Sequence, residues 1–245
     1  GNHSKVSSNI LTIYVQSGGT GAIVGENTQI YSRGSMTILG GNITLSGYSQ
    51  GLYSNSYMNI YGGQISIEAE SDCIYAENDV TINGGEVSAT MTGNGNAICG
   101  HHVVINGGVV TTTNQQGYGN GIYGYYDVTI NGGIVTANVA ANGYGIKAGY
   151  YQPLPITLGW TNETDRITSD SYYGEVTIAT GQAFSDEAGN YYMFTLNDSQ
   201  VAAISGQTLI PFTDIDMPFS ITYETDGGTL PDGYPTTYTF DETTS

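Results

Sequence analysis

A ten-residue segment recurs five times between residues 36 and 137 of this 245-residue chain. The copies read MTILGGNITL, MNIYGGQISI, VTINGGEVSA, VVINGGVVTT and VTINGGIVTA. Their Gly-Gly pairs begin at Gly40, Gly62, Gly84, Gly107 and Gly132, so the spacing is 22, 22, 23 and 25 residues. A nearly constant period in the twenties is typical of a protein built from stacked repeats, and it restricts the fold more than any single motif does.

Each repeat contains three short segments of alternating apolar residues. In one copy they are CIYA (73–76), VTI (80–82) and EVSA (86–89), a pattern that predicts β-strands. The Asn-Gly-Gly corner before the third strand predicts a tight turn, because Gly adopts positive φ without steric cost. Three strands in 22 to 25 residues predict one turn of a parallel β-helix, where each strand pairs with its equivalents in neighbouring turns.

Equivalent positions of successive repeats carry similar side chains, which supports the stacked arrangement. The large apolar column is Ile30, Leu52, Ile74, Ile98, Ile122 and Ile146, and the small column two residues later is Ser32, Ser54, Ala76, Gly100, Gly124 and Ala148. Large columns beside small ones fill a narrow interior at high density. We therefore predict an all-β fold, a right-handed single-stranded parallel β-helix of about six or seven turns with a β-rich C-terminal cap.

The pattern divides the chain into three parts. Residues 1–153 are expected to form the β-helix, with a polar lead-in over residues 1–10 and a capping first turn from LTIYV and GAIVG. Residues 154–217 lack the Gly-Gly corner and are expected to form an irregular β cap or the last turns. Residues 218–245 begin with Pro218, which marks a linker, and are expected to begin a small surface repeat that stops before it is complete.

A short helix is expected within the second part. The segment QVAAIS (200–205) follows Asp198 and Ser199, whose side chains are suited to accept hydrogen bonds from the amides of a first helical turn. We therefore predict that one of these two residues caps the helix.

The charge balance argues against a nucleic-acid partner, and the distribution of apolar residues argues against membrane insertion. The chain has 4 Lys and Arg against 22 Asp and Glu, a net charge of −18. Such a chain cannot displace counterions from nucleic acid, so we expect no nucleic-acid partner. It contains no run of about 18 apolar residues, so we expect no membrane insertion. The few charged residues and many Gly, Asn, Ser, Thr and Tyr resemble secreted bacterial surface proteins, from which we expect an extracellular or cell-surface location with the signal sequence trimmed.

The two cysteines, Cys73 and Cys99, lie in neighbouring repeats but in columns offset by two residues. That offset places their Cα atoms roughly 8 Å apart, beyond the ~7 Å reach of a disulfide. We therefore predict two free thiols.

The segment I-Y-A-x-x-D-V-T-I-N-G-G-x-V (74–87) resembles a bacterial family of secreted carbohydrate-binding β-helix proteins. The resemblance covers about residues 29–150 and implies a pectate-lyase-like fold that binds acidic polysaccharides such as polygalacturonate with calcium. It also implies an asparagine ladder, which Asn83, Asn106 and Asn131 match. Family repeats carry an acid just before the first strand; here Asp72 keeps it, and the equivalents are Gln50, Asn96, Asn120 and Tyr144.

The tail FSITYETDGGTLPDGYPTTYTF (219–240) resembles the opening strands of the Listeria–Bacteroides repeat, a small β-grasp-like module of bacterial surface proteins. The residues that carry this resemblance are Ile221, Tyr223, Gly227, Gly228, Thr239 and Phe240.

A column of tyrosines follows the large apolar column by one residue and should therefore point outward. It contains Tyr31, Tyr53, Tyr75 and Tyr123, with Cys99 and Lys147 in the remaining turns. Two interpretations are open: the rings form a platform for sugar rings, or they only stack on one another and cover apolar surface. The corner before the first strand varies most between repeats, so we expect binding to use this column and that corner.

One dense acidic patch is a candidate calcium site, formed by Glu70, Asp72, Glu77 and Asp79 beside Glu68. Ca²⁺ needs roughly six to eight oxygen ligands, which one repeat could supply together with backbone carbonyls. The alternative is a solvated acidic corner, because the spacing matches no defined calcium loop.

Catalysis is not expected. Glu68 and Glu70 have a spacing near that of inverting glycosidases, but a convex surface gives no reason for a raised pKa. A lyase needs a base beside calcium, and Arg33 lies two turns from Asp72. His101 and His102 are adjacent, so their side chains diverge and we interpret them as surface residues.

These observations favour a non-catalytic, secreted or cell-surface binding protein for carbohydrate, either a polysaccharide or a host surface glycan. We expect a monomer without a required cofactor, with Ca²⁺ as a candidate ligand. Two alternatives stay open. One is a structural adhesin or spacer stalk, and the other is a polysaccharide lyase.

Overall fold

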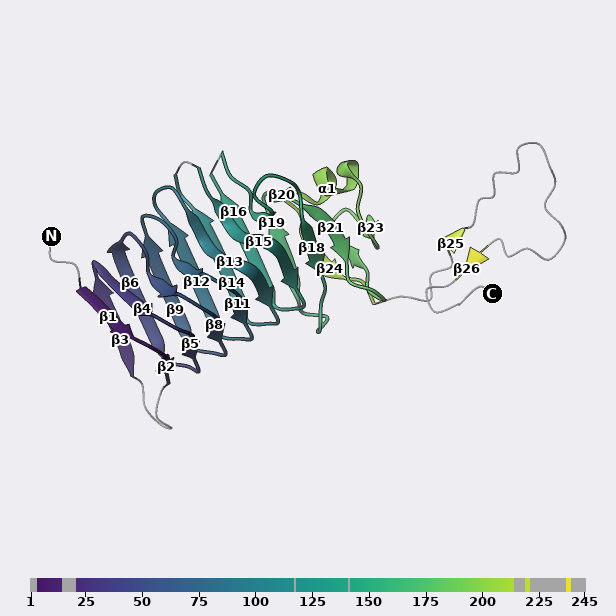
Figure 1. Ribbon diagram of the computed structural model, residues 1–245. Helices are drawn as coiled ribbons and strands as arrows, with labels where there is room; N and C mark the ends of the chain where they lie inside the picture. The colour runs from purple at the N-terminus through teal and green to yellow at the C-terminus, as the bar shows by residue number, and fades with distance from the viewer. Residues whose placement is uncertain are drawn as a thin grey trace, which may run out of the picture.

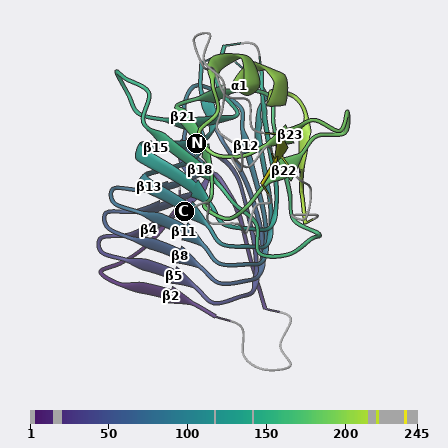
Figure 2. The same cartoon turned by 90° about the vertical axis from the view of Figure 1, so that its right-hand side faces the viewer.

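A computed structural model describes residues 4–14, 21–116, 118–140, 142–213, 219–220 and 237–238. The chain is almost entirely β and winds into a solenoid of about seven turns, so the predicted parallel β-helix is confirmed. Figure 1 shows the turns stacked from the purple N-terminal end to the green C-terminal end. Figure 2 looks at the end that carries α1 and shows the strands as walls around a common interior.

Three sets of parallel strands form the walls. The first strands are β1 (Ser4–Ser8), β4 (Thr28–Ser32), β7 (Leu52–Ser54), β10 (Ile74–Ala76), the first half of β13 (Asn96–Ile105), the first half of β15 (Asn120–Ile130), β17 (Ile146–Ala148) and β20 (Tyr172–Tyr173). The second strands are β2 (Leu11–Ile13), β5 (Met36–Ile38), β8 (Met58–Ile60), β11 (Val80–Ile82), the second halves of β13 and β15, β18 (Pro155–Leu158) and β21 (Glu175–Ile178). The third strands are β3 (Ala22–Glu26), β6 (Asn42–Tyr48), β9 (Gln64–Ala69), β12 (Glu86–Met91), β14 (Val109–Asn114), β16 (Ile134–Val139) and β19 (Arg166–Ser169).

The register confirms the predicted columns. Leu52 pairs with Ile30 on one side and with Ile74 on the other, and the column continues to Ile146. All its members are at most 1 % exposed. Because side chains alternate along a strand, burial of this column places the next residue of each first strand on the outer surface.

The second glycine of the Gly-Gly corner is required by its backbone. Gly85 has φ of 89°, and a Cβ on Gly108, at φ 91°, would lie 2.6 Å from the carbonyl oxygen of Gly85. Positive φ and the close approach of successive turns both exclude a side chain there. The Gly-Gly segment therefore recurs along the sequence because every turn needs the same tight corner.

The asparagine ladder implied by the family resemblance is present beside this corner. Asn106 Nδ2 donates to Asn83 Oδ1, and Asn131 Nδ2 donates to Asn106 Oδ1, both at 2.8 Å. Asn106 is therefore hydrogen-bonded to the asparagines in the turns before and after it.

Replacing the middle amide should destabilise the solenoid. Asn106→Ala leaves Asn83 Oδ1 and Asn131 Nδ2 without partners, so we expect a loss of about 1–3 kcal/mol in the free energy of unfolding. Urea denaturation followed by circular dichroism measures it. Asn59→Ala, on the outer face of β8, is the matched control, and an equal effect at both sites would contradict the ladder's role.

The C-terminal end of the solenoid is closed by three antiparallel strands and a helix. The strands are β22 (Phe184–Ser185), β23 (Tyr191–Tyr192) and β24 (Thr208–Pro211), and the helix is α1 (Asp198–Ile204). β24 runs antiparallel to β19 and ends the third wall. Figure 1 shows α1 and these strands gathered at the green end of the stack.

Two local predictions need correction. Helix α1 is present, but its N-cap is Asn197, which forms a capping box with Gln200 and makes Asp198 the first helical residue. The first turn begins earlier than predicted, since Ser4–Ser8 pairs with Thr28–Ser32 as a full first strand. This strand was not predicted because its residues are mostly polar and do not show the apolar alternation of the other strands.

Two further expectations concern the cysteines and the C-terminal surface repeat. Cys73 and Cys99 are free and buried, as predicted, and Cys99 pairs with Tyr75 in the register. Within residues 218–245, β25 (Phe219–Ser220) pairs antiparallel with β26 (Thr237–Tyr238). The remaining positions of the predicted surface repeat, including Ile221, Tyr223, Gly227, Gly228, Thr239 and Phe240, lie outside the described residues.

Candidate functional site

The outward tyrosine column extends over all eight of the first strands named above. Its members in register are Ser7, Tyr31, Tyr53, Tyr75, Cys99, Tyr123, Lys147 and Tyr173. The ring centroids of Tyr31 and Tyr53 lie 5.3 Å apart, and those of Tyr53 and Tyr75 lie 5.0 Å apart. The rings therefore overlap, and part of each face is covered by its neighbour. Lys5 lies over the far face of Tyr31, with Nζ 3.6 Å from its centroid.

Burial raises the pKa of phenols in this column. Removal from water is the main cause that raises the pKa of Tyr75 to about 12. Burial also raises the pKa of Tyr53, together with its hydrogen bond to Glu77 Oε1 at 2.9 Å. The column offers neutral ring edges and hydroxyls at neutral pH.

The raised pKa values predict an alkaline loss of stability. The unfolded state ionises near the ordinary pKa of 10.0, whereas Tyr75 in the folded state holds its proton until about pH 12. The folded state therefore binds more protons in this window, and stability is present below pH 10 and is lost as the pH rises toward 12. Urea midpoints measured across this window check the prediction, and Tyr75→Phe should reduce the slope. A flat midpoint would contradict it.

Tyr123 does not share the exposure of the other predicted tyrosines. It is 4 % exposed, because Tyr125 packs 4.8 Å from its ring and Lys147 lies 5.3 Å above it. The cause is local: β15 carries one residue more than β13 at the corner, where the register shifts, and this brings Tyr125 back over the first-strand face. The Tyr123 hydroxyl is buried and has no hydrogen-bond partner among the described residues.

A cavity of about 460 Å³ lies beside Tyr123, and we call it the tyrosine pocket. Its lining comes from three successive turns and their variable corners: Gly95, Asn96, Tyr118, Gly119, Asn120, Tyr123, Tyr125, Asn142, Tyr144, Lys147 and Tyr150. Tyr118 and Tyr150 are 73 % and 59 % exposed. The pocket thus combines free aromatic surface with three side-chain amides.

Lys147 lies among aromatic rings. Its Nζ is 5.0 Å from the ring centroid of Tyr173, 5.3 Å from that of Tyr123 and 5.9 Å from that of Tyr144. Burial lowers its pKa. Within the described part of the chain, no Lys or Arg lies within ion-pair distance of a carboxylate, so Lys147 is stabilised by ring faces and not by a carboxylate.

A second row of polar side chains lies beside the first strands, and we call it the corner ladder: Gln29, Gln50, Asp72, Asn96 and Asn120. Of these, Asn96 and Asn120 line the tyrosine pocket. Gln29 Nε2 donates to Gln50 Oε1 at 3.2 Å. Asp72 Oδ1 accepts from the backbone N–H of Asn96 at 2.8 Å and from its Nδ2 at 3.2 Å. Asn120 Nδ2 donates to Asn96 Oδ1 at 2.8 Å.

The four predicted calcium ligands do not gather into a metal-binding cluster. No three His, Cys, Asp or Glu side chains among the described residues gather to hold an ion. Asp72 is committed to the corner ladder, and Glu77 accepts from Tyr53. Glu70 is exposed at the end of the third-strand segment, and Asp79 precedes β11 at the next corner. The structure therefore does not bring Glu70, Asp72, Glu77 and Asp79 together.

A second cavity lies on the same face nearer the N-terminus. Its volume is about 390 Å³, and it is lined by Lys5, Gln29, Tyr31, Gln50, Tyr53, Asn55 and Glu77. The predicted tyrosines are therefore divided between two hollows: Tyr31 and Tyr53 line this one, and Tyr123 lies under the tyrosine pocket. Tyr75 lies between them in the register.

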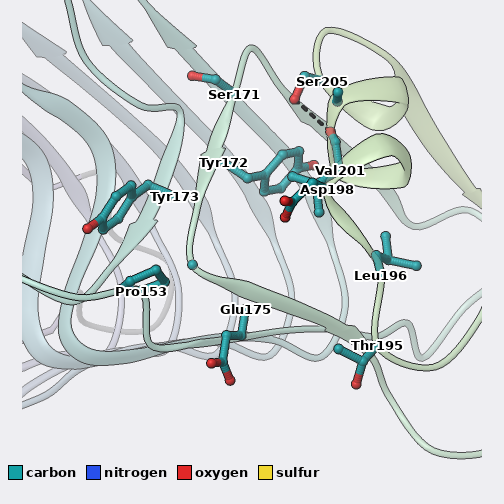
Figure 3. Close-up of a pocket in the computed structure, with 12 residues that line it drawn as sticks. Pro153, Ser171, Tyr172, Tyr173, Glu175, Thr195, Leu196, Asp198, Val201 and Ser205 are labelled. Atoms are coloured by element: carbon teal, nitrogen blue, oxygen red, sulfur yellow. Dashed lines mark hydrogen bonds between the residues drawn. The ribbon is translucent and has the colours of Figure 1, made fainter.

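A third cavity, of about 470 Å³, lies between β20 and α1 at the capped end. Figure 3 shows Tyr172 directed from its strand toward α1, near Asp198 and Val201, with Leu196 on the far side. Tyr172 is 7 % exposed and packs in the core. This cavity offers mainly apolar surface to a ligand, so the tyrosine pocket is the better candidate for a polar, ring-shaped ligand.

The histidine pair lies on the surface, as predicted, but neither ring is isolated, because both pack against Tyr126 with ring centroids 5.2 and 5.4 Å away. His102 Nδ1 lies 2.5 Å from Asp127 Oδ2, one turn above it. His101 packs edge-on against Tyr125, with ring centroids 5.8 Å apart.

Sequence reasoning missed part of the pocket. Tyr118 and Asn142 belong to the variable corners, where no column could align them. The polar residues before each first strand were visible as departures from an acidic pattern, and their amide chemistry was the available signal for the corner ladder.

The comparisons with known proteins agree with this geometry. A family model described as "Carbohydrate-binding domain-containing protein" matches residues 5–150, which include the tyrosine column as far as Lys147 and the whole tyrosine pocket. Comparison with curated proteins and with solved structures finds no significant match. No helix among the described residues has the length and apolar character needed to cross a membrane.

Proposed function

Because the chain belongs to the family of carbohydrate-binding domain-containing proteins, we propose that it binds carbohydrate at the tyrosine pocket and catalyses no reaction there. The observation that carries the proposal is the composition of that pocket. Exposed rings supply flat apolar surface for the C–H faces of sugars, and a few amides supply hydrogen bonds to hydroxyls. Tyr118, Tyr150 and Asn142 are the residues most open to a ligand.

The proposed partner is a polysaccharide or a host surface glycan, met outside the cell or on its surface. Support comes from composition: charged residues make up 11 % of the chain, and it has 21 tyrosines and 36 glycines. This composition is typical of secreted surface proteins, and the acidic excess keeps stacked strands soluble.

The finer form of the proposal is an acidic polysaccharide bound through calcium in a pectate-lyase-like fold, as the family resemblance implies. A net charge of −18 repels a polyanion unless a cation lies between them. A neutral glycan needs no such bridge. Calcium dependence therefore distinguishes the two ligand classes.

A glycan array tests the proposal, with neutral and acidic polysaccharides probed in Ca²⁺ and in chelator. Binding in both conditions supports a neutral ligand, and binding only in Ca²⁺ supports the acidic form. Absence of signal for every glycan in both conditions would overturn the proposal.

A structural spacer is the second candidate, and the mutual stacking of the tyrosine column favours it. Stacked rings cover apolar surface without any ligand. The double variant Tyr53→Ala with Tyr75→Ala separates the two functions. Lower stability with unchanged glycan binding makes the column structural, whereas lost binding places it in the site. A lyase would instead release unsaturated, ultraviolet-absorbing products from polygalacturonate.

A further inference from the structure

The corner ladder has one carboxylate within a row of amides, and this carboxylate fixes the direction of the hydrogen bonds along the row. A carboxylate only accepts hydrogen bonds, so Asn96 must turn its Nδ2 toward Asp72. Its Oδ1 then faces the next turn and accepts from Asn120 Nδ2. On the other side, burial raises the pKa of Asp72, and the nearby Gln50 side chain offsets part of that rise. Asp72 thus has an amide on each side, with Asn96 hydrogen-bonded to it and Gln50 close by.

The far end of the ladder agrees with this direction. Asn120 Oδ1 accepts from the backbone N–H of Tyr144 at 3.2 Å. The backbone N–H of Asn96 also donates to Asp72, which holds the carboxylate oxygen in place. Asparagine amides can otherwise turn over and exchange donor for acceptor, and the carboxylate at one end and the Tyr144 N–H at the other favour the same arrangement.

Each amide in the ladder has a second N–H that the ladder does not use. Asn96 and Asn120 both line the tyrosine pocket. With their direction fixed, they present donors to a ligand, one strand spacing of about 4.8 Å apart. Sugar hydroxyl and ring oxygens are the matching acceptors.

We infer that Asp72 is a positioning residue for carbohydrate recognition, which holds Asn96 and Asn120 as hydrogen-bond donors toward a ligand in the tyrosine pocket. This inference rests on the proposed function. It gives Asp72 a role through its acceptor oxygen, in contrast to a role through its charge as a calcium ligand.

Two conservative variants separate these roles. Asp72→Asn keeps an acceptor oxygen for Asn96, and Gln50 can turn its amide over to accept from the new NH₂ group. Asp72→Glu keeps the charge but moves the acceptor by one methylene. Positioning predicts near-wild-type binding for Asp72→Asn and at least fivefold weaker binding for Asp72→Glu. A role of the charge predicts the opposite order.

Affinity electrophoresis in gels containing hydroxyethyl cellulose or polygalacturonate, with and without Ca²⁺, measures binding of wild type, Asp72→Asn, Asp72→Glu and Asp72→Ala. Thermal melting checks folding, and if Asp72→Ala does not fold, the Asn and Glu variants still decide. Distinct, slowly exchanging NMR signals of the Asn96 and Asn120 side-chain amides should persist in Asp72→Asn and merge or broaden in Asp72→Glu.

The outcomes are distinguishable. Retardation that survives Asp72→Asn and weakens in Asp72→Glu supports the inference. Retardation that survives Asp72→Glu and weakens in Asp72→Asn, or that no variant changes, overturns the positioning role and leaves the proposed function standing. If neither polymer retards the wild type, the proposed function fails for both polymers and the inference fails with it.

Discussion

Ile82→Asp is expected to unfold the middle of the solenoid, with a loss of at least about 4 kcal/mol in the free energy of unfolding. Ile82 is fully buried, and it pairs with Ile60 and Ile105 in the turns on either side. The substitution removes apolar packing and places an unpaired carboxylate in the interior, which is costlier still. Circular dichroism during urea denaturation measures the loss.

The stacked topology makes this defect spread. Each turn contacts only its neighbours, so a turn that cannot form also removes the pairing partners of the turns beside it. Hydrogen exchange should therefore accelerate in β8, β11 and the second half of β13 first. Thr81→Asp is the matched control, because Thr81 is the adjacent residue on the outer face of β11, and it should cost less than about 1 kcal/mol. Equal losses at both positions would contradict the assigned core.

The fold could be predicted because the repeat period and the columns of apolar residues are visible in the sequence. Pairing of like with like requires residues such as Ile30, Leu52 and Ile74 to recur at equal spacing, and any one-residue slip would turn the apolar set outward. The same alternation that buries these residues predicted which tyrosines leave the core. Local repetition therefore carries global information in a solenoid.

The candidate site could be predicted only in part, for a physical reason. The tyrosine pocket depends on an extra residue in β15 and on corners of unequal length, and neither repeats. Burial of Tyr123 under Tyr125 follows from that insertion, so column reasoning alone expected an exposed ring. Likewise, first-strand residues without apolar alternation, as in Ser4–Ser8, are held by pairing with the next turn and not by their own pattern.

Stacking and binding are compatible explanations of the aromatic residues once they are assigned to different places. Tyr31, Tyr53 and Tyr75 cover one another and form a rigid wall. Tyr118 and Tyr150 have no such partner in the column and stay exposed at the pocket. The loss of a wall residue should therefore affect stability first, and the loss of a pocket residue should affect binding first.

Removal of both exposed pocket rings is accordingly expected to give the largest loss of carbohydrate binding. Tyr118→Ala with Tyr150→Ala deletes two ring surfaces, each of which contributes about 1 kcal/mol to contact with a flat ligand. The sum of about 2 kcal/mol corresponds to a roughly thirtyfold rise in Kd. Isothermal titration calorimetry with the polysaccharide that gives the strongest array signal measures it.

The control for this pair is Tyr61→Ala, because Tyr61 is 54 % exposed but lies at the Gly-Gly corner, away from the residues that line the tyrosine pocket. It should leave Kd within about twofold of wild type. The melting temperature of the double variant should stay close to that of the wild type, since neither ring packs in the core. Unchanged affinity in a folded double variant would remove the tyrosine pocket as the site, whereas a loss shared with Tyr61→Ala would point to a nonspecific effect of surface aromatic residues.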